Sequence, residues 1–244
     1  MDERFAKTRR AADAHFWYHG FRRFITPVLE EVADGRTNLR ILDCGCGVGQ
    51  NLPMLARYGH SVGLELEPVA AAAGREFGRP IACADITRIP FSDHAFDLAV
   101  SFDVLQVIEP DLAAVREMAR VVRPGGRVVL TMAAFDILSG DHSEVWNECR
   151  RYTPRAARAL AESAGLIVDR VSFLFASLFP IMFAVRTTQR VMRPFRDRPS
   201  HSDIEVPWAP VNSALILLLD GEAALSRYVP MPVGTSLVVV ARKP

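Results

Sequence analysis

An alternating glycine run between two acidic side chains carries the most chemical information in this sequence. Asp43 precedes Gly45, Gly47 and Gly49, and Glu65 ends the apolar stretch that follows. Glycines allow the backbone to turn sharply and a ligand to approach the main chain closely. A carboxylate at the position of Glu65 accepts hydrogen bonds from ribose hydroxyls in nucleotide-binding folds. The pattern therefore predicts a ligand that contains a nucleoside.

The spacing of the glycines separates this loop from the dinucleotide-binding fingerprint. Gln50 occupies the position where that fingerprint has its third glycine. Asp43 stands two residues before the first glycine, where its charge would repel a pyrophosphate. A carboxylate there suits a ligand with an ammonium group, and S-adenosylmethionine (SAM) carries one.

Strands and helices alternate around this loop. Apolar segments predict strands at 40–43, 60–65, 80–85, 96–101, 127–132, 166–173 and 235–241. Helical patterns are expected at 5–32, 51–58, 111–121 and 153–164, and a turn is expected at 123–126. Such alternation indicates an α/β fold with a mainly parallel sheet and helices on both of its faces.

A long excursion separates the last two expected strands. Residues 174–234 contain two apolar helical stretches, 174–191 and 211–228, joined by a segment rich in proline and charge. A short hairpin could close the sheet, so we expect the excursion to form a helical cap over an acceptor pocket. A dimer interface and a membrane-surface element are the alternatives. The arginines of this region are interpreted as a solvated helix face, with binding of a phosphate-bearing or membrane-dissolved substrate as the alternative; they are Arg186, Arg190, Arg193, Arg196 and Arg198.

Five motifs together resemble one known family. They read ILDCGCGVGQN, VGLELEP, ADITRIPFSDHAFDLAVSFDVLQVI, RVVRPGGRVVL and YTPRAARALAESAGL. The stretch from about residue 40 to residue 168 is similar to class I SAM-dependent methyltransferases, especially the small-molecule subgroup similar to quinone-biosynthesis methyltransferases. The resemblance implies a Rossmann-like, seven-stranded, mostly parallel sheet. Its last strand would lie antiparallel beside the fifth, with a helical insertion between the sixth and seventh strands.

The resemblance also implies a set of cofactor-binding residues. The methionine end of SAM would lie on Asp43, Gly45 and Gly47, with Asn51 nearby, and the ribose on Glu65. The adenine would contact Leu66, Asp85 and Ile86, and the transferred methyl would lie beside Ser101 and Phe102. Gln106 stands where many relatives carry a histidine, so the role of that histidine does not carry over.

The implied domain boundaries follow from these elements. Residues 1–36 would form an N-terminal helical segment or flap, and residues 37–173 the SAM-binding core. Residues 174–234 would form the cap, and residues 235–244 the final core strand.

Candidate residues for the acceptor side lie in two places. His142 and Tyr152 follow the fifth strand and are the candidate catalytic residues, since a histidine there could remove a proton from an acceptor hydroxyl. The aromatic and imidazole cluster before the core forms either a flap over the ligands or an ordinary packed helix; it comprises His15, Trp17, Tyr18 and His19. Asp97 is expected to have a structural role.

Composition limits the other classes of function. The net charge is +1, and no N/D-P-P-Y/F motif follows the fourth strand, so nucleic acid is not the expected partner. The four cysteines fit reduced thiols, and no second Cys/His pair stands at ligand spacing, so no metal site is expected. The N-terminus lacks an apolar signal region, and the longest apolar run, near 173–185, is too short to span a bilayer. A cytoplasmic location is expected.

The sequence thus predicts a SAM-dependent methyltransferase that yields S-adenosylhomocysteine. Its acceptor would be a small aromatic or lipid-like molecule, methylated on oxygen, nitrogen or carbon. A non-catalytic SAM-binding regulatory protein and an NAD-dependent oxidoreductase are the alternatives. The chain would be a monomer or homodimer with, at most, weak peripheral membrane contact through residues 174–198.

Overall fold

A mixed seven-stranded sheet forms the centre of the computed structural model, which describes residues 14–76, 78–192 and 206–244. The strand order is β3-β2-β1-β4-β5-β7-β6. The strands are β1 (Leu39–Cys44), β2 (Gly59–Glu65), β3 (Ile81–Cys83), β4 (Phe96–Phe102), β5 (Val122–Ala133), β6 (Ile167–Leu174) and β7 (Ser236–Arg242). The first five pair in parallel, whereas β7 runs antiparallel to both of its neighbours, β5 and β6. The predicted fold class is confirmed, including the antiparallel last strand beside the fifth.

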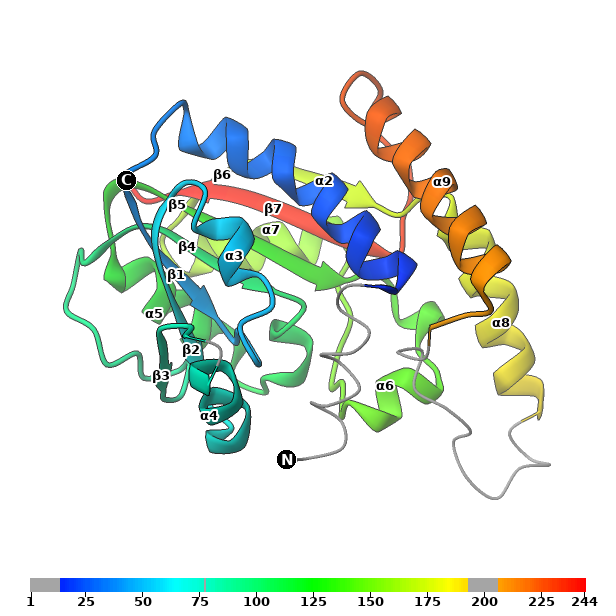
Figure 1. Ribbon diagram of the computed structural model, residues 1–244, viewed down its shortest axis with the longest axis horizontal. Coiled ribbons are helices and arrows are strands. Elements are labelled where there is room, and N and C mark those ends of the chain that lie inside the picture. The colour runs from blue at the N-terminus through cyan, green and yellow to red at the C-terminus, as the bar shows by residue number, and fades with distance from the viewer. Residues whose placement is uncertain (1–13, 77, 193–205) are drawn as a thin grey trace.

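Helices cover both faces of this sheet, as Figure 1 shows. They are α2 (Phe16–Ala33), α3 (Leu52–Leu55), α4 (Pro68–Glu76), α5 (Asp111–Val121), α6 (Asp141–Val145), α7 (Pro154–Ser163), α8 (Leu178–Met192) and α9 (Ala209–Leu225). One apolar cluster joins α2, α3 and α9 to the sheet, and a second joins α5 and α7 to the opposite face. Ile41 belongs to the first cluster and Leu42 to the second, which explains why β1 is apolar on both faces.

Two elements differ from the expected ones. The helix expected at 51–58 shrinks to α3, because the chain must bring Tyr58 and Gly59 against Leu39, whose N–H donates to the Tyr58 carbonyl at 3.0 Å. Gly59 has a φ of 150°, and a Cβ there would collide with the Leu39 backbone. The turn expected at 123–126 lies inside β5, because Gly125 donates to the Lys243 carbonyl at 3.0 Å and extends the pairing.

The described part of the expected N-terminal helix is α2. His15 caps it by accepting a hydrogen bond from the Trp17 N–H at 3.1 Å. The side of α2 that faces the sheet is apolar and buried, with Phe21, Phe24 and Ile25 among its members. Asp97, expected to be structural, pairs with Arg40 and Arg123 at the start of β4.

The excursion between β6 and β7 forms α8 and α9. The side chain of Asp220 on α9 pairs with His19 at 3.1 Å and Arg23 at 2.8 Å, both on α2. Gly20 makes room for this contact, since a Cβ there would meet Leu219 at 2.5 Å. Helix α9 is therefore held on α2 by charge and by close packing together.

A buried carboxylate on α9 also holds the start of α8. Glu222 accepts hydrogen bonds from the N–H groups of Ala176 at 2.6 Å and Ser177 at 2.8 Å, just before α8 begins. These are N–H groups that a helix start leaves without an intrahelical acceptor. Glu222 thus joins the two helices of the insertion.

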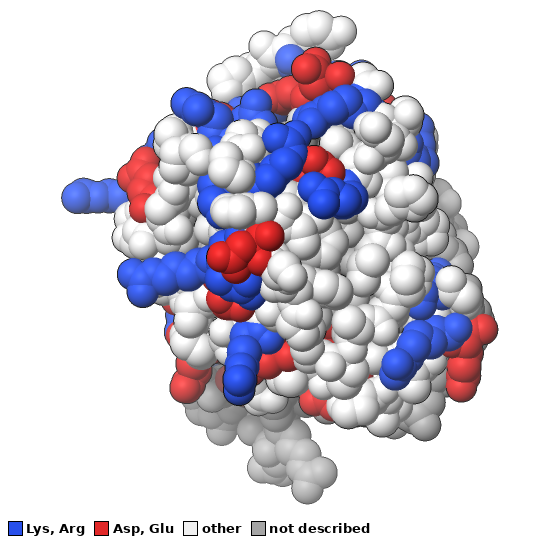
Figure 2. Space-filling model, turned by 90° about the vertical axis from the view of Figure 1, so that its left-hand side faces the viewer, with Lys and Arg blue, Asp and Glu red and all other residues white. Residues whose placement is uncertain are grey.

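Charged residues of both signs are interspersed over the face shown in Figure 2, which is the left-hand side of Figure 1. No broad field of one sign forms on that face. It offers no extended basic track of the kind that binds a nucleic-acid backbone.

We expect Glu222→Ala to lower the free energy of unfolding by about 1.5–3 kcal/mol, because two N–H groups lose a charged acceptor. Chemical denaturation of the variant and of the wild type measures this difference. Glu109→Ala, at an exposed carboxylate, is the matched control and should change stability little. Equal stability of the Glu222 variant and the wild type would contradict the proposed link between α8 and α9.

Candidate active site

A cavity of about 550 Å³ opens at the carboxyl ends of the parallel strands. It lies where β1 has β2 on one side and β4 on the other, so that the strand order reverses there. Ligands bind at this point in open α/β sheets. The volume is in the range of small-molecule binding sites.

The glycine loop forms one wall of the cavity. Gly45, Gly47 and Gly49 have φ values of 79°, 57° and 74°, a region that other residues adopt only at a cost. A Cβ on Gly45 would also meet the Val104 side chain at 2.5 Å. Residue type and spacing in this loop are therefore set by its backbone path, as the sequence predicted.

Asp43 lies just before this loop at the end of β1 and, unlike Gly45 and Gly47, is not among the residues that line the cavity. Its side chain is buried, and its Oδ2 has no hydrogen-bond partner among the described residues. Burial raises the pKa of this carboxyl to about 7, and the nearby charge of Glu65 contributes to the same shift. A buried carboxylate without a partner is unfavourable, and a cationic or donor group placed beside it would remove that cost.

Glu65 ends β2 and shapes the same wall. Its two carboxylate oxygens accept hydrogen bonds from the N–H groups of Gly47 at 2.8 Å and Glu67 at 2.9 Å. Leu66 follows on the cavity wall and is 56% exposed, so a large apolar side chain lies there uncovered. A flat ring of a ligand could cover it.

The remaining residues expected at the cofactor fall into two groups. Asn51, Asp85, Ile86 and Phe102 line the cavity together with the glycine loop and Glu65. Ser101 does not line it; its hydroxyl donates to the Cys44 carbonyl at 3.0 Å and ties β4 to β1. Its contribution is structural support beneath the cavity floor.

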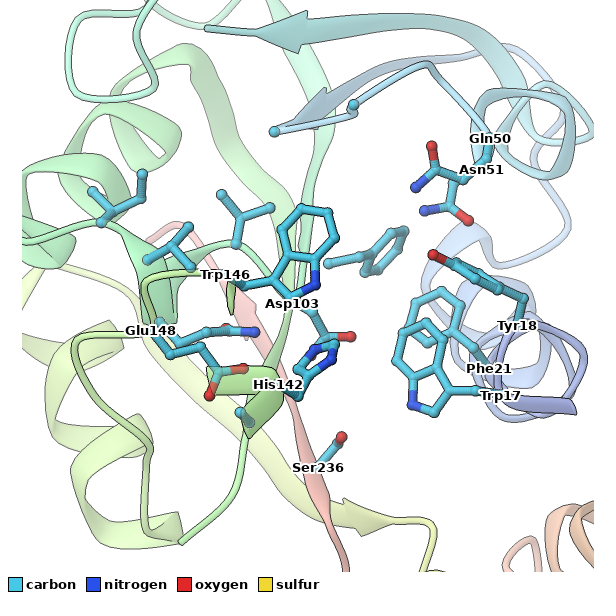
Figure 3. A pocket seen from close by; sticks show the side chains of 18 of the residues that line it. Trp17, Tyr18, Phe21, Gln50, Asn51, Asp103, His142, Trp146, Glu148 and Ser236 are labelled. Carbon is cyan, nitrogen blue, oxygen red and sulfur yellow. The ribbon is translucent and has the colours of Figure 1, made fainter. Parts of the chain in front are cut away.

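Aromatic side chains from α2 form a second wall. Trp17, Tyr18 and Phe21 line the cavity, and Figure 3 shows them facing Asp103, His142 and Trp146 across it. Phe21 also packs edge-on against Phe102, with ring centroids 5.2 Å apart. His15 lines the cavity as well, whereas His19 pairs with Asp220 instead. The cluster is both a packed helix and a cavity wall.

Asp103 is a cavity residue that the sequence did not single out. It follows β4 directly and has a φ of 56°, a conformation fixed by hydrogen bonds from its N–H to the Thr131 carbonyl at 3.1 Å and hydroxyl at 3.0 Å. Its Oδ2 is buried with no partner among the described residues. Burial raises the pKa of Asp103 to about 7; the Thr131 hydroxyl opposes this rise, and Glu148 adds to it. An acid at the carboxyl end of a central strand was the available sequence signal.

The two expected catalytic residues are placed differently. His142 lies on α6 and lines the cavity, near the ring of Trp146. Tyr152 is buried outside the cavity lining, where its hydroxyl lies 2.8 Å from the Asp111 carboxylate and 3.2 Å from the Leu105 carbonyl. The structure therefore gives Tyr152 the task of holding the segment after α6 against α5.

The arginines of the insertion correct another expectation. Arg186 was expected on a solvated face but is buried and lines the cavity, with a hydrogen bond to Gln189 at 2.8 Å. It follows Leu178 and Met182 on the same face of α8, since residues four apart share a helix face. Arg190 is exposed. The other three arginines of that stretch lie outside the described residues.

Comparison with known proteins gives a family match within the core. Residues 42–130 match the model described as a methyltransferase domain. A demethylmenaquinone methyltransferase from Mycobacterium sp. (strain KMS) is 34% identical over 132 residues, which cover 51% of this chain and 54% of that protein. An uncharacterized 37.1 kDa transposon protein from Streptomyces fradiae is 30% identical over 70% of this chain and 50% of its own. The chain thus spans about half the length of these curated relatives.

Solved structures share the fold at low sequence identity. A SAM-dependent methyltransferase from Mesorhizobium loti has a TM-score of 0.57 at 18% identity, covering 89% of this chain and 96% of that one. Phosphoethanolamine N-methyltransferase 2 from Haemonchus contortus, solved with SAM, has a TM-score of 0.58 at 19% identity, covering 89% of this chain and 51% of that one. The cyclase SpnF has a TM-score of 0.59 at 22% identity, covering 91% and 80%.

The raised pKa values of Asp43 and Asp103 generate a prediction about stability and pH. Each carboxyl keeps its proton up to about pH 7 when folded but loses it near 3.8 when unfolded. Its contribution to stability is therefore lost as the pH rises through this window. We expect Asp43→Asn and Asp103→Asn to gain stability relative to the wild type between pH 5 and pH 8, measured by urea denaturation of ligand-free protein. A difference that stays constant with pH would refute it.

Sheet order and loop chemistry agree with these comparisons. A dinucleotide-binding Rossmann sheet is parallel in the order 3-2-1-4-5-6, whereas this chain inserts an antiparallel β7 between β5 and β6. The glycine loop and the acidic residues Asp43 and Glu65 fall within the matched segment. Residues 42–130 thus match a methyltransferase domain, their sequence relatives include demethylmenaquinone methyltransferases, and the chain shares its fold with solved SAM-dependent methyltransferases.

Proposed function

We propose that this protein transfers a methyl group from SAM to a small molecule with an aromatic or lipid-like body. One observation carries the proposal. Glu65 and the glycine loop line a cavity that also has an aromatic wall, and the buried carboxylate of Asp43 lies just before that loop, outside the cavity lining. The loop end has the chemistry for a nucleoside with an ammonium group, and the aromatic wall has the chemistry for an apolar acceptor.

The residues at the loop end fit SAM on chemical grounds. The Oδ2 of Asp43 lacks a partner among the described residues, and a cationic ligand end would supply one. The oxygens of Glu65 have lone pairs left for ribose hydroxyls after accepting from Gly47 and Glu67. The exposed Leu66 offers a surface for the adenine, with Asp85 and Ile86 at its edge.

The other half of the cavity fits an apolar acceptor. Trp17, Tyr18 and Phe21 supply an aromatic wall, and Leu178 and Met182 supply an aliphatic one. Bound SAM supplies an electrophilic methyl on a good leaving group. The walls would hold the acceptor in line with that methyl and exclude water, which is the principal task left to the protein. Helix α8 would act as the cap, and α9 would support it through α2 and Glu222.

Asp103 is the residue that we propose as the proton acceptor. It lies on the cavity between Trp146 and His142 in Figure 3, and its buried oxygen is unpartnered among the described residues. An acceptor hydroxyl or amine hydrogen-bonded to Asp103 would pass its proton to this carboxylate as its bond to the methyl forms, while the methyl–sulfur bond of SAM would break and S-adenosylhomocysteine would leave. A base with a pKa near 7 suits this role at neutral pH. His142 is the second candidate, because it lies on the same wall.

The direct test is a screen of small hydroxy, amino and quinone-like acceptors with labelled SAM, read by mass spectrometry. Methylated product, together with S-adenosylhomocysteine, supports the proposal. Tight SAM binding with no product from a cell extract that contains the natural metabolites would favour the regulatory alternative. NAD binding without SAM binding would overturn the proposal.

We expect Glu65→Ala to weaken SAM binding by about 1.5–3 kcal/mol, roughly a tenfold to hundredfold loss of affinity. The variant removes the proposed hydrogen-bond acceptor for the ribose hydroxyls. It also removes the acceptor of the Gly47 N–H, so the loop loses this support. Isothermal titration calorimetry measures the effect. Glu76→Ala, at an exposed position on α4, is the control and should bind as the wild type does. Unchanged affinity in the Glu65 variant would remove Glu65 from the cofactor site.

We expect Asp103→Asn to keep SAM binding and to lose methyl transfer by about 10²–10⁴-fold, the typical contribution of a general base. Wild-type kcat/KM should rise with pH through about 7, because the carboxylate must be ionised to accept a proton. The variant should lack this rise. Glu109→Gln, an exposed carboxylate with the same change of charge, should retain the wild-type profile. A pH rise that survives in Asp103→Asn would point to His142 instead.

A further inference from the structure

The helix α9 has its charged side chains on its inner face and large apolar side chains on its outer face. Both of its charged residues turn toward the protein, where Asp220 pairs with α2 and Glu222 holds the start of α8. Its exposed large side chains are apolar: Val211, Leu217, Leu218 and Leu225. Surface helices of globular proteins show the opposite arrangement, with charge toward the solvent.

The helix α8 is arranged in the same way. Its buried charged residue, Arg186, faces the cavity, and Arg190 is its only other charged residue. Apart from Arg190, its exposed large side chains are apolar: Ile181, Phe183, Val185, Val191 and Met192. Figure 1 places α8 and α9 on the same side of the molecule, and Glu222 joins them. Monomeric proteins seldom expose apolar surface of this extent without a partner.

The ends of α9 indicate what kind of partner covers this surface. Trp208, at its start, is 76% exposed, and Tyr228, just beyond its end, is 86% exposed. Trp and Tyr side chains concentrate where hydrocarbon meets water in a bilayer, because they combine an apolar ring with a polar group.

Charge points to the same partner. Arg190 on α8 and Arg227 beside Tyr228 are exposed, whereas the outer faces of α8 and α9 carry no acidic residue among those described. This arrangement complements anionic headgroups. The face in Figure 2, by contrast, mixes both signs.

We propose that the outer faces of α8 and α9 dock on the surface of an anionic phospholipid bilayer. The helices lie in the plane of the interface, with their apolar residues among the upper acyl chains and the arginines at the headgroups. Among the described residues, no helix is long and apolar enough to cross a membrane. The inner side of α8 lines the cavity through Leu178 and Met182, so docking brings the cavity next to the bilayer.

The experiment uses the full chain and vesicles of phosphatidylcholine, with or without phosphatidylglycerol, in a flotation assay. The wild type should float with the vesicles, and more strongly when phosphatidylglycerol is present. The double variant L217E/L218E should lose at least tenfold in binding. Brominated lipids should quench wild-type tryptophan fluorescence through Trp208, and this quenching should be lost in Trp208→Phe.

The matched control places two carboxylates at exposed apolar positions elsewhere. Val69 on α4 and Ile167 on β6 serve this purpose, and V69E/I167E should float as the wild type does. Thermal stabilisation by S-adenosylhomocysteine, measured on all variants, separates this proposal from that of methyl transfer. A wild type that stays unbound at every lipid concentration would overturn the docking proposal. Equal vesicle binding by L217E/L218E and the wild type would also overturn it. So would a wild type that forms a dimer and does not bind vesicles, if L217E/L218E is monomeric.

Discussion

A carboxylate buried at the carboxyl end of β1 is the constraint on which this structure depends. Asp43 lies just before the glycine loop with one oxygen unpartnered among the described residues, and burial holds its pKa near 7. Such a group persists only where the surrounding fold fixes it and a ligand can compensate it. The positive φ angles of the loop keep the backbone clear of the space above it. Glu65 holds the loop in place by accepting a hydrogen bond from the Gly47 N–H, so the proposed cofactor site and the fold share this contact.

A second carboxylate with a buried, unpartnered oxygen among the described residues, Asp103, lies on the side of the cavity proposed for the acceptor. Asp103 is held in a left-handed conformation by two hydrogen bonds to Thr131 on the neighbouring strand. Asp43 lies near the end of β1 and Asp103 directly after β4. These two strands are adjacent, at the point where the strand order reverses. A cationic cofactor end at one acid and an acceptor nucleophile at the other would place the two reactants across a single cavity. This is an economical division of tasks for a transfer reaction, in which positioning supplies much of the rate.

The described charged side chains of α9, and Arg186 of α8, also face the interior of the protein. The two acidic residues of α9 make internal contacts: Asp220 holds α9 to α2, and Glu222 holds α8 to α9. The buried Arg186 of α8 faces the cavity. The outer surface of α8 and α9 is left mainly apolar as a consequence. Helix α8 therefore supplies a cavity wall on its inner side and an apolar surface on its outer side.

The sequence by itself determined the fold class, the glycine loop and the residues next to it, because these depend on local backbone geometry and on short, ordered motifs. The antiparallel β7 also followed from the resemblance and was confirmed. Tertiary structure alone decided which distant side chains meet. Arg186 looked like part of a solvated basic run, yet packing turned it inward, and Tyr152 was drawn to Asp111 rather than to the cavity. Asp103 gained its character from burial beside Thr131 and Glu148, residues that are distant in the chain. Helical spacing shows that a face is apolar, but only the folded chain shows whether that face points inward or outward.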